Sequence, residues 1–276
     1  MSLGFPNAAE VGQTSSPVYF LHIPKTAGTT FHTFLSTQYD ESDICPAHLW
    51  SQLLAWSPEQ IGKCSLIRGH FYAHLHRYVP QAMRYVTFVR DPVERALSHY
   101  GHIMAAAPHY LHARAHAMGD FGSYLRDPEL ATTLNNFQVR ALAVEFDPPS
   151  VAAAMSREEL SNLELERHIE VHVPTQSTQQ LLDIATFRLK QACFVGITEQ
   201  MNESVALARE RFHWHRPAEI ESHNANPQRL RASDLPAGDL ALLRKLNEAD
   251  YELYGAARRR LTDEIEEARA TGALRS

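Results

Sequence analysis

The chain has 276 residues, and 44% of them are hydrophobic, which is enough for the core of a single α/β domain. Its formal net charge of −6 argues against nucleic acid and against a long sulfated polymer as partners, because proteins that bind polyanions usually present a basic face. Three cysteines without paired spacing indicate neither a disulfide framework nor a thiolate zinc site.

The sequence contains no apolar stretch of roughly eighteen residues that could span a membrane, and residues 1–5 lack the basic and apolar regions of a signal peptide. We therefore expect a cytoplasmic protein without a membrane partner. Residues 1–276 are expected to form a single domain, with a flexible N-terminal arm over residues 1–16. A charged, solvated terminal helix is expected over residues 256–276.

The first predicted strand, residues 17–23, runs into a turn, and a helix is predicted over residues 29–39. The start of a helix presents unpaired backbone N–H groups and the positive end of the helix dipole. Lys25 adds a full positive charge to the turn, so an anionic ligand is expected there. An ordinary strand-to-helix turn with a solvent-facing lysine is the alternative interpretation.

The order of residues separates this turn from the P-loop of nucleoside-triphosphate enzymes, because Lys25 precedes Gly28 instead of following a second glycine. The turn resembles the 5′-phosphosulfate loop of the sulfotransferases, which use 3′-phosphoadenosine 5′-phosphosulfate (PAPS) as sulfuryl donor. The resemblance implies that Lys25 is a catalytic residue and that no metal is required. It implies the following donor-binding residues: Pro24, Lys25, Thr26, Ala27, Gly28, Thr29 and Thr30.

A second strand is predicted over residues 65–69, and His70 follows it directly, where open parallel sheets place their ligands. Transfer to a hydroxyl group needs a base, and histidine serves best near neutral pH. The Gly-His pair at this point resembles the one that carries the catalytic base in the 2-O-sulfotransferases. We therefore predict His70 as the base, with His74 and His76 as alternatives. A metal site made by these histidines is less favoured, because no cysteine or carboxylate lies at a familiar ligand spacing.

Residues 84–100 repeat the strand-then-helix plan. The run over residues 85–89 is β-branched and aromatic, Asp91 is a predicted N-cap, and Pro92 suits the first helical position. Arg90 is therefore expected to leave the end of a strand just before a helix.

The Arg-Asp-Pro-x-x-Arg-x-x-Ser-x-Tyr pattern of this segment resembles the 3′-phosphate-binding segment of the sulfotransferases. The resemblance implies that Arg90 and Ser98 hold the 3′-phosphate, and a guanidinium can bind phosphate through two parallel N–H bonds. Arg95 is interpreted differently, as the i,i+4 salt-bridge partner of Asp91.

Two later segments resemble parts of the membrane-associated carbohydrate sulfotransferases. Asn136-Phe137-Gln138-Val139-Arg140 resembles their Asn-x-Gln-x-Arg segment, and Val195-Gly196-Ile197-Thr198-Glu199 resembles their Val-Gly-x-Thr-Glu strand end. Both segments follow the two phosphate-loop motifs in the same order along the chain as in that family. The chain most resembles the uronyl and heparan-sulfate 2-O-sulfotransferases and their bacterial homologues.

The remaining pattern predicts a mainly helical region over residues 110–168, interrupted by glycine and proline, which we expect on the acceptor side. Residues 169–173 and 192–197 are candidate strands beside helical segments. The predicted fold class is α/β: a P-loop-like three-layer fold with a central parallel β-sheet flanked by helices, plus the helical acceptor-side region.

Taken with the resemblance, these residues predict a sulfotransferase that moves a sulfuryl group from PAPS to an acceptor hydroxyl. The acceptor is expected to be a carbohydrate or a small natural product, and the transfer is expected to be in line, with a histidine general base. A kinase-like phosphotransferase is the alternative enzyme, although it would need magnesium-binding carboxylates and a Walker-type lysine. A nucleotide-binding protein that has lost catalysis is the non-enzymatic alternative.

Overall fold

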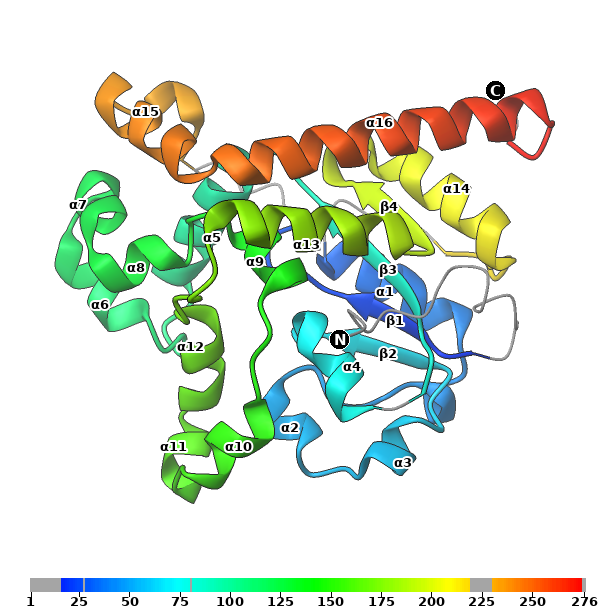
Figure 1. Ribbon diagram of the computed structural model, residues 1–276, viewed down its shortest axis with the longest axis horizontal. Coiled ribbons are helices and arrows are strands. Elements are labelled where there is room, and N and C mark those ends of the chain that lie inside the picture. The colour runs from blue at the N-terminus through cyan, green and yellow to red at the C-terminus, as the bar shows by residue number, and fades with distance from the viewer. Residues whose placement is uncertain (1–15, 27, 80, 219–229, 275–276) are drawn as a thin grey trace.

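The computed structural model describes residues 16–26, 28–79, 81–218 and 230–274. Within them, four parallel strands form one sheet in the order β2-β1-β3-β4 (Figure 1). The strands are β1 (Val18–Leu21), β2 (Leu66–Gly69), β3 (Arg84–Val89) and β4 (Phe194–Ile197). Leu21 lies opposite both Gly69 in β2 and Thr87 in β3. Because the strands are parallel, their carboxyl ends meet at one edge of the sheet, and the predicted α/β class is confirmed.

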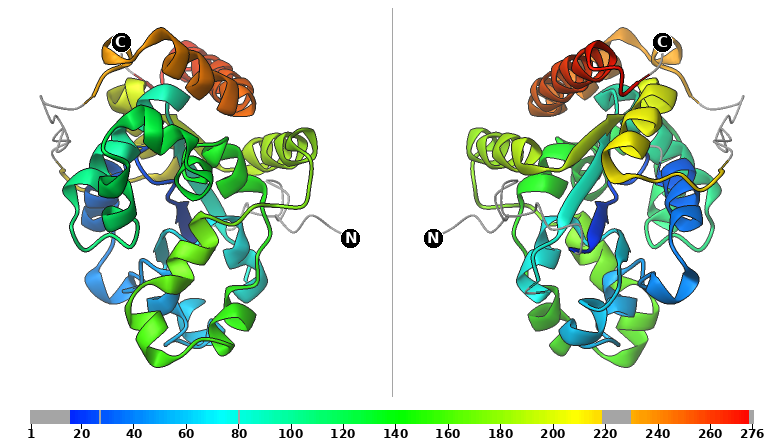
Figure 2. Two further views of the ribbon diagram at one scale, coloured as in Figure 1. Left: turned by 90° about the vertical axis from the view of Figure 1, so that its left-hand side faces the viewer. Right: turned by 90° about the vertical axis from the view of Figure 1, so that its right-hand side faces the viewer.

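Helices cover both faces of this sheet and make three layers (Figures 1 and 2). One face carries α1 (Gly28–Gln38) and α14 (Met201–Phe212), and the other carries α4 (Leu75–Tyr78), α9 (Phe137–Ala143) and α13 (Thr178–Gln191). The 23-residue helix α16 (Glu248–Ala270) runs along the β4 side and packs on β4 and α13.

Aromatic side chains fill the space between α1 and the sheet. Phe31 of α1 packs on Phe20 of β1 and on Phe88 of β3, with ring centroids 5.0 and 4.5 Å apart. Full burial of each such side chain stabilises the fold by roughly 1.5–3 kcal/mol. This packing fixes the start of α1 against the carboxyl ends of β1 and β3.

The region between β3 and β4 is helical, as predicted, and its part over residues 93–134 forms a second core cluster together with Leu243. Gly119 ends one helix at a φ of 80°, and Pro128 and Pro148 each begin another. The helices are α5 (Pro92–Ala105), α6 (His112–Met118), α7 (Phe121–Arg126), α8 (Pro128–Thr132), α10 (Pro148–Ala153), α11 (Arg157–Ser161) and α12 (Glu164–Glu170). The elements elsewhere are η1 (Glu41–Asp43), α2 (Trp50–Leu53), α3 (Pro58–Ile61), η2 (Tyr72–His74), η3 (Thr198–Gln200), η4 (Ala232–Asp234) and α15 (Ala237–Leu246).

The strand predicted over residues 169–173 is wrong. Ile169 and Glu170 complete α12, and the chain continues as a loop. The Arg140 guanidinium accounts for this difference, because it donates hydrogen bonds to the backbone carbonyls of Glu170 and His172 at 3.0 and 2.5 Å. These carbonyls are therefore engaged by a side chain and not by a neighbouring strand.

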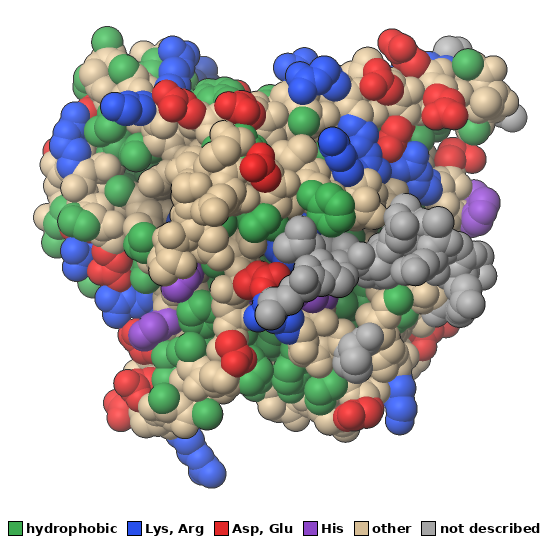
Figure 3. Space-filling model, viewed as in Figure 1, with side chains coloured by type: hydrophobic (Ala, Val, Ile, Leu, Met, Phe, Trp, Pro, Cys, Tyr) green, Lys and Arg blue, Asp and Glu red, His purple; other side chains and the backbone are tan. Residues whose placement is uncertain are grey.

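The terminal helix also differs from its prediction. Residues 256–270 continue α16, and Ala257, Leu261 and Ile265 are buried, because they extend the apolar stripe of Leu253 at i,i+4 spacing. The side facing solvent carries intermixed acidic and basic side chains, visible along the top of Figure 3. The predicted N-terminal arm lies outside the described residues except for Ser16, whose carbonyl accepts a hydrogen bond from Arg84 Nε at 3.1 Å.

Candidate active site

The turn between β1 and α1 places Lys25 at the carboxyl edge of the sheet. Its φ of 70° is in the left-handed region, where a non-glycine residue is strained, and such strain is typical of functional sites. Buried Thr26 holds the turn closed, since its Oγ1 donates a hydrogen bond to the Ile23 carbonyl at 2.8 Å. Of the predicted donor loop, Pro24, Thr26, Thr29 and Thr30 lie around Lys25 and the first turn of α1, and Ala27 lies outside the described residues.

Gly28 begins α1 directly against the imidazole of His22. A Cβ atom on Gly28 would lie 1.5 Å from His22 Nε2, so close approach, and not a special φ, requires glycine here. The His22 ring in turn stacks on Phe20 at 5.3 Å. The first turn of α1, with its unpaired N–H groups, is therefore held close to the strand ends.

Arg90 follows β3 and meets Lys25 across the sheet edge. Its Nη1 donates a hydrogen bond to the Lys25 carbonyl at 3.2 Å. Partial burial and the neighbouring Arg90 charge both lower the pKa of Lys25. Two cations held together in this way repel each other, and an anionic ligand between them would offset that repulsion. Glu94 and Glu199 form ion pairs with the Arg90 guanidinium, at 3.7 and 3.9 Å.

Gln138 fixes the backbone at Arg90. Its side-chain amide donates to the Arg90 carbonyl and accepts from the Arg90 N–H, each at 2.9 Å. The carboxylate of buried Asp250 accepts from the N–H groups of Gln138 and Val139, at 3.1 and 2.8 Å, and Asn136 Oδ1 accepts from the Asp250 N–H at 3.0 Å. The Asn-x-Gln-x-Arg segment thus fixes the backbone of the loop after β3, which is predicted to bind the 3′-phosphate.

Glu199, in η3 just after β4, supports the same loop. One carboxylate oxygen accepts from the Asp91 N–H at 3.1 Å, and the other accepts from the Tyr254 hydroxyl at 3.0 Å. The Asp91 carboxylate caps α5 by accepting from the Glu94 N–H at 3.0 Å, as predicted. Sequence reasoning singled out both segments by resemblance but missed the contacts of Gln138, Glu199 and Asp250, which no local pattern signals.

Ser98 and Arg95 lie on different sides of α5. Ser98 is partly exposed two turns beyond Arg90, and its hydroxyl has no hydrogen-bond partner among the described residues. Arg95 is fully buried: its Nη2 donates to the Thr133 carbonyl at 2.7 Å, and its guanidinium lies 4.8 Å from the Phe137 ring centroid. The interpretation of Arg95 as the salt-bridge partner of Asp91 is therefore wrong, because this face of α5 points into the protein.

His70 lies at the end of β2 with one imidazole nitrogen already engaged. Its Nδ1 is 3.0 Å from the His22 carbonyl oxygen, which can only accept, so Nδ1 carries the proton. Burial lowers the pKa of His70 below its ordinary value, although the His22 carbonyl opposes this change. Near pH 7 the ring is therefore neutral with its lone pair on Nε2, which is the form that a general base requires.

The two alternative histidines have other environments. His74 is 3% exposed, and its Nδ1 accepts the Phe146 N–H at 3.0 Å, so its proton is on Nε2 and no lone pair is available. Burial and the nearby Arg188 charge lower the pKa of His74 to about 3. His76 donates from Nδ1 to the Ala73 carbonyl, and the charges that lower its pKa are those of Arg188 and Arg77. Of the three, the structure brings His70 to the sheet edge that Lys25 and Arg90 share.

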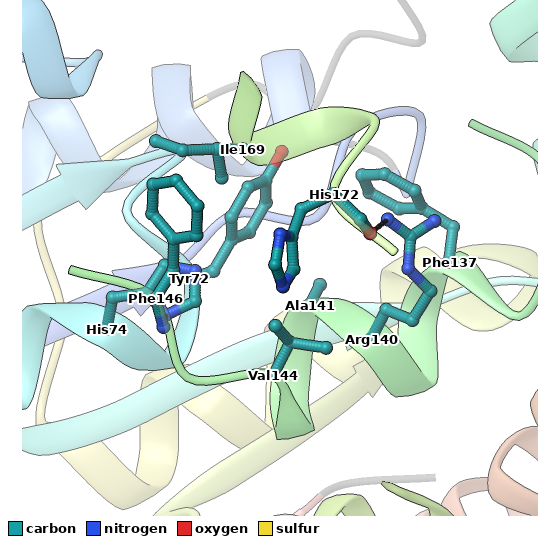
Figure 4. Close-up of a pocket in the computed structure, with 9 residues that line it drawn as sticks. All are labelled: Tyr72, His74, Phe137, Arg140, Ala141, Val144, Phe146, Ile169 and His172. Atoms are coloured by element: carbon teal, nitrogen blue, oxygen red, sulfur yellow. Dashed lines mark hydrogen bonds between the residues drawn. The ribbon is translucent and has the colours of Figure 1, made fainter. Parts of the chain in front are cut away.

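A small cavity opens beyond η2, next to this edge. Its volume of about 20 Å³ has room for one water molecule and is too small for a nucleotide or a sugar. Figure 4 shows its lining residues, which are Tyr72, His74, Phe137, Arg140, Ala141, Val144, Phe146, Ile169 and His172. The candidate site is therefore the sheet edge and not this cavity.

Two further observations concern the described residues as a whole. None of their His, Cys, Asp and Glu side chains form a group of three or more that could hold a metal ion. In the same part of the chain, no helix has both the length and the apolar character needed to cross a bilayer.

The parallel sheet, with a cationic loop at the start of α1, defines a P-loop-like α/β protein. Comparison with known proteins identifies its family: the profile described as "Sulfotransferase family" matches residues 13–255. The chain belongs to the sulfotransferase family, which is a family of enzymes. This confirms the resemblance that the two phosphate-loop motifs indicated.

Two curated relatives are similar to the chain. A protein-tyrosine sulfotransferase from Arabidopsis thaliana is 34% identical over 121 residues, which cover 43% of this chain and 24% of that protein. Heparan-sulfate 6-O-sulfotransferase 2 from Gallus gallus is 24% identical over 285 residues, covering 87% of this chain and 66% of that protein. The matched region is therefore shorter than two thirds of either relative.

Proposed function

We propose that the chain transfers a sulfuryl group from PAPS to an acceptor hydroxyl of a carbohydrate or a small natural product. The observation that carries the proposal is the contact between the Lys25 turn and Arg90, which joins two cationic loops at the carboxyl ends of β1 and β3. Two phosphate-binding loops at one edge suit a nucleotide with both a 5′ and a 3′ phosphate group.

The residues present fit this donor. The N–H groups at the start of α1, with the hydroxyls of Thr29 and Thr30, would hold the 5′-phosphate, while Thr26 keeps the turn closed through its hydrogen bond to the Ile23 carbonyl. Arg90 and the Ser98 hydroxyl would hold the 3′-phosphate. When bound, PAPS supplies the sulfuryl group and leaves as 3′-phosphoadenosine 5′-phosphate (PAP).

His70 and Lys25 would be the catalytic residues. His70 Nε2 takes the proton of the acceptor hydroxyl as the acceptor oxygen forms its bond to sulfur. The bond between sulfur and the bridging oxygen breaks, and its electron pair stays on the leaving phosphate. The Lys25 ammonium stabilises the negative charge that develops there. Partial burial of Lys25 strengthens this interaction, because fewer water molecules screen it.

One argument supports a hydroxyl group as acceptor, and a second favours a small or weakly charged acceptor. The matched relatives are named for tyrosine and for heparan sulfate, so hydroxyl groups of both kinds occur as acceptors among proteins similar to this chain. The net charge of −6 argues against a long sulfated polymer, which a basic surface would attract.

A nucleotide titration followed by an acceptor screen tests the proposal. PAP should raise the melting temperature far more than AMP or magnesium-ATP, and PAPS with a panel of sugars and phenols should give a sulfated product detectable by mass spectrometry. Stronger stabilisation by magnesium-ATP would favour the phosphotransferase alternative. Binding of PAP without any sulfated product would favour a nucleotide-binding protein that has lost catalysis.

A further inference from the structure

Two of the three cysteines are neighbours in the folded chain, although α2 and α3 separate them in sequence. Both are free thiols: Cys45 is 1% exposed, and Cys64 is half-buried. The Cys64 thiol donates a hydrogen bond to the Cys45 sulfur. Because such a bond joins only groups in contact, the two sulfur atoms lie side by side. Their spacing along the chain gives no sign of this contact.

The backbone holds the two cysteines at the two ends of one segment. Ile44 pairs with Leu66 of β2 as an isolated parallel bridge, and the Cys45 N–H donates to the Leu66 carbonyl at 2.8 Å. Residues 46–63, which include α2 and α3, leave β2 after Cys45 and return to it at Cys64. We call residues 46–63 the α2–α3 segment. A bond between the two sulfur atoms would close this segment into a loop.

The surroundings of Cys45 favour its thiolate. The hydrogen bond from the Cys64 thiol lowers the pKa of Cys45, burial opposes this change, and the Arg68 charge adds to it. Arg68 of β2 is 9% exposed, its Nη1 is 3.5 Å from the Cys45 carbonyl oxygen, and its Nε has no hydrogen-bond partner among the described residues. The same thiol hydrogen bond raises the pKa of Cys64. Cys45 is therefore the nucleophile of the pair, and Cys64 keeps its proton.

The third cysteine has a different environment. Cys193 directly precedes β4, and no other cysteine is among the groups that act on its thiol. Burial raises the pKa of Cys193, although three arginines oppose this change. Cys193 therefore stays a thiol near pH 7 and serves as an internal control.

The α2–α3 segment contacts both the proposed base and the helical region. The His48 carbonyl accepts a hydrogen bond from the His70 N–H at 2.9 Å. The Ser51 N–H donates to the carboxylate of Glu166, in α12, at 2.9 Å. A covalent link between the ends of the segment would restrict its local opening beside the sheet edge.

We propose that Cys45 and Cys64 form a reversible oxidation site, and that their disulfide fastens the α2–α3 segment. The oxidant is a peroxide, because the buried Cys45 sulfur is accessible only to a small molecule. The Cys45 thiolate forms a bond to one peroxide oxygen as the O–O bond breaks. The hydroxide that leaves takes up the proton released by the Cys45 thiol, which gives one water molecule and Cys45 sulfenic acid.

Disulfide formation completes the reaction. The Cys64 sulfur forms a bond to the Cys45 sulfur, the S–O bond breaks, and the leaving hydroxide takes the Cys64 proton as a second water molecule. The two thiols together lose two electrons, which reduce the peroxide. A dithiol reverses the oxidation through thiol–disulfide exchange.

Peptide mapping of the folded chain tests the inference. The chain is treated with hydrogen peroxide, blocked with N-ethylmaleimide and digested with trypsin without reduction. Trypsin cleaves after Lys63 and after Arg68, so the disulfide would join peptide 26–63 to peptide 64–68. This linked pair should form in the parent and in the control Cys193→Ser, and dithiothreitol should remove it.

Cys64→Ser, at a half-buried position, separates the two steps. It should form no linked pair, and the sulfenic acid at Cys45 should be trapped by dimedone, because no second thiol is present to displace it. Dimedone labelling of Cys193 in place of Cys45 would overturn the assignment of the nucleophile.

Two physical measurements test the fastening of the segment. The oxidised parent should melt roughly 5–10 °C above the reduced parent, because a closed loop lowers the entropy of the unfolded chain. Peroxide should not raise the melting temperature of Cys64→Ser. Hydrogen–deuterium exchange within residues 46–63 should be slower in the oxidised parent than in the reduced parent.

The remaining outcomes would overturn the inference. They are the absence of the linked pair in the folded parent, its formation only in urea, and links to Cys193 in similar yield. An unchanged or lowered melting temperature of the oxidised parent would show that the disulfide does not fasten the segment. If Cys64→Ser fails to fold, the mapping of the parent and of Cys193→Ser decides the question. None of these measurements depends on sulfuryl transfer, so they can be read whether or not the proposed function holds.

Discussion

Gln138 and Arg90 are joined by two hydrogen bonds through a single side-chain amide, both at 2.9 Å. They are 48 residues apart and belong to different elements, α9 and the loop after β3. The position of the Arg90 backbone therefore depends on a side chain of α9, a helix that packs on α13 and α16. Because Gln138 is fully buried, water cannot replace either bond if the amide is removed.

Gln138→Ala should lower the free energy of unfolding by about 1–3 kcal/mol for each backbone group left unpaired. It should also weaken PAP binding more than AMP binding, since Arg90 would lose its fixed position. Denaturant unfolding and thermal-shift titrations measure the two effects. Gln179→Ala, an exposed glutamine whose amide bonds Asp183, is the control, and a stability loss of similar size there would remove the special role of Gln138.

Arg90→Ala should erase the preference for PAP over AMP, because the two nucleotides differ in the 3′-phosphate that Arg90 is proposed to hold. In the parent chain, a hundredfold excess of PAP over its dissociation constant should stabilise the fold by about 2.7 kcal/mol. Arg114→Ala, which removes an exposed ion pair with Asp127, should retain the preference. An unchanged preference in Arg90→Ala would mean that the 3′-phosphate binds elsewhere.

His70→Ala and Lys25→Ala should separate proton transfer from donor binding. His70→Ala should reduce turnover roughly 10²- to 10⁴-fold while PAP affinity stays near that of the parent, because the base faces the acceptor. Lys25→Ala should reduce both. Rates, PAP affinities and melting temperatures are measured together, with His76→Ala as the control. Near-parental turnover in folded His70→Ala would eliminate His70 as the base.

The pH dependence of the rate should follow the neutral form of His70. Burial lowers the pKa of His70, so the ring stays neutral, and active, below the ordinary value of about 6.5. Turnover should therefore hold down to about pH 6.5 and fall only as the pH drops through the lowered pKa. A profile of kcat/KM against pH measures this, and a limb centred above pH 7 would contradict the assignment.

Gly28→Ala should destabilise the protein by about 1–3 kcal/mol, because the added methyl group overlaps the His22 ring. The double variant His22→Ala, Gly28→Ala should recover part of that loss, since removing the ring makes room for the methyl group. A double-mutant cycle in denaturant measures the coupling. If the two substitutions have additive effects on the free energy of unfolding, the contact with the His22 ring does not explain the glycine at position 28. Gly238→Ala, with open space around its Cβ position, is the control.

The local sequence was sufficient to predict those features that depend on a few neighbouring residues. The run before Lys25 predicted β1, and the Asp91-Pro92 pair predicted the start of α5, because N-caps and strand patterns act over a few residues. The two phosphate-loop motifs predicted the family, and the order of strands and helices predicted a parallel sheet. The assignment of donor and catalytic roles to Lys25, Arg90 and His70 remains a prediction.

Tertiary structure decided what depends on partners distant in sequence. The burial of Arg95 and the loss of the strand predicted over residues 169–173 follow from contacts across the helical region, which spacing along the chain does not encode. His70 carries its proton on Nδ1 only because the His22 carbonyl, 48 residues away, lies within hydrogen-bond distance. The sequence alone determined which residue types reach the sheet edge, while the packing of strands and helices determined their protonation and their partners.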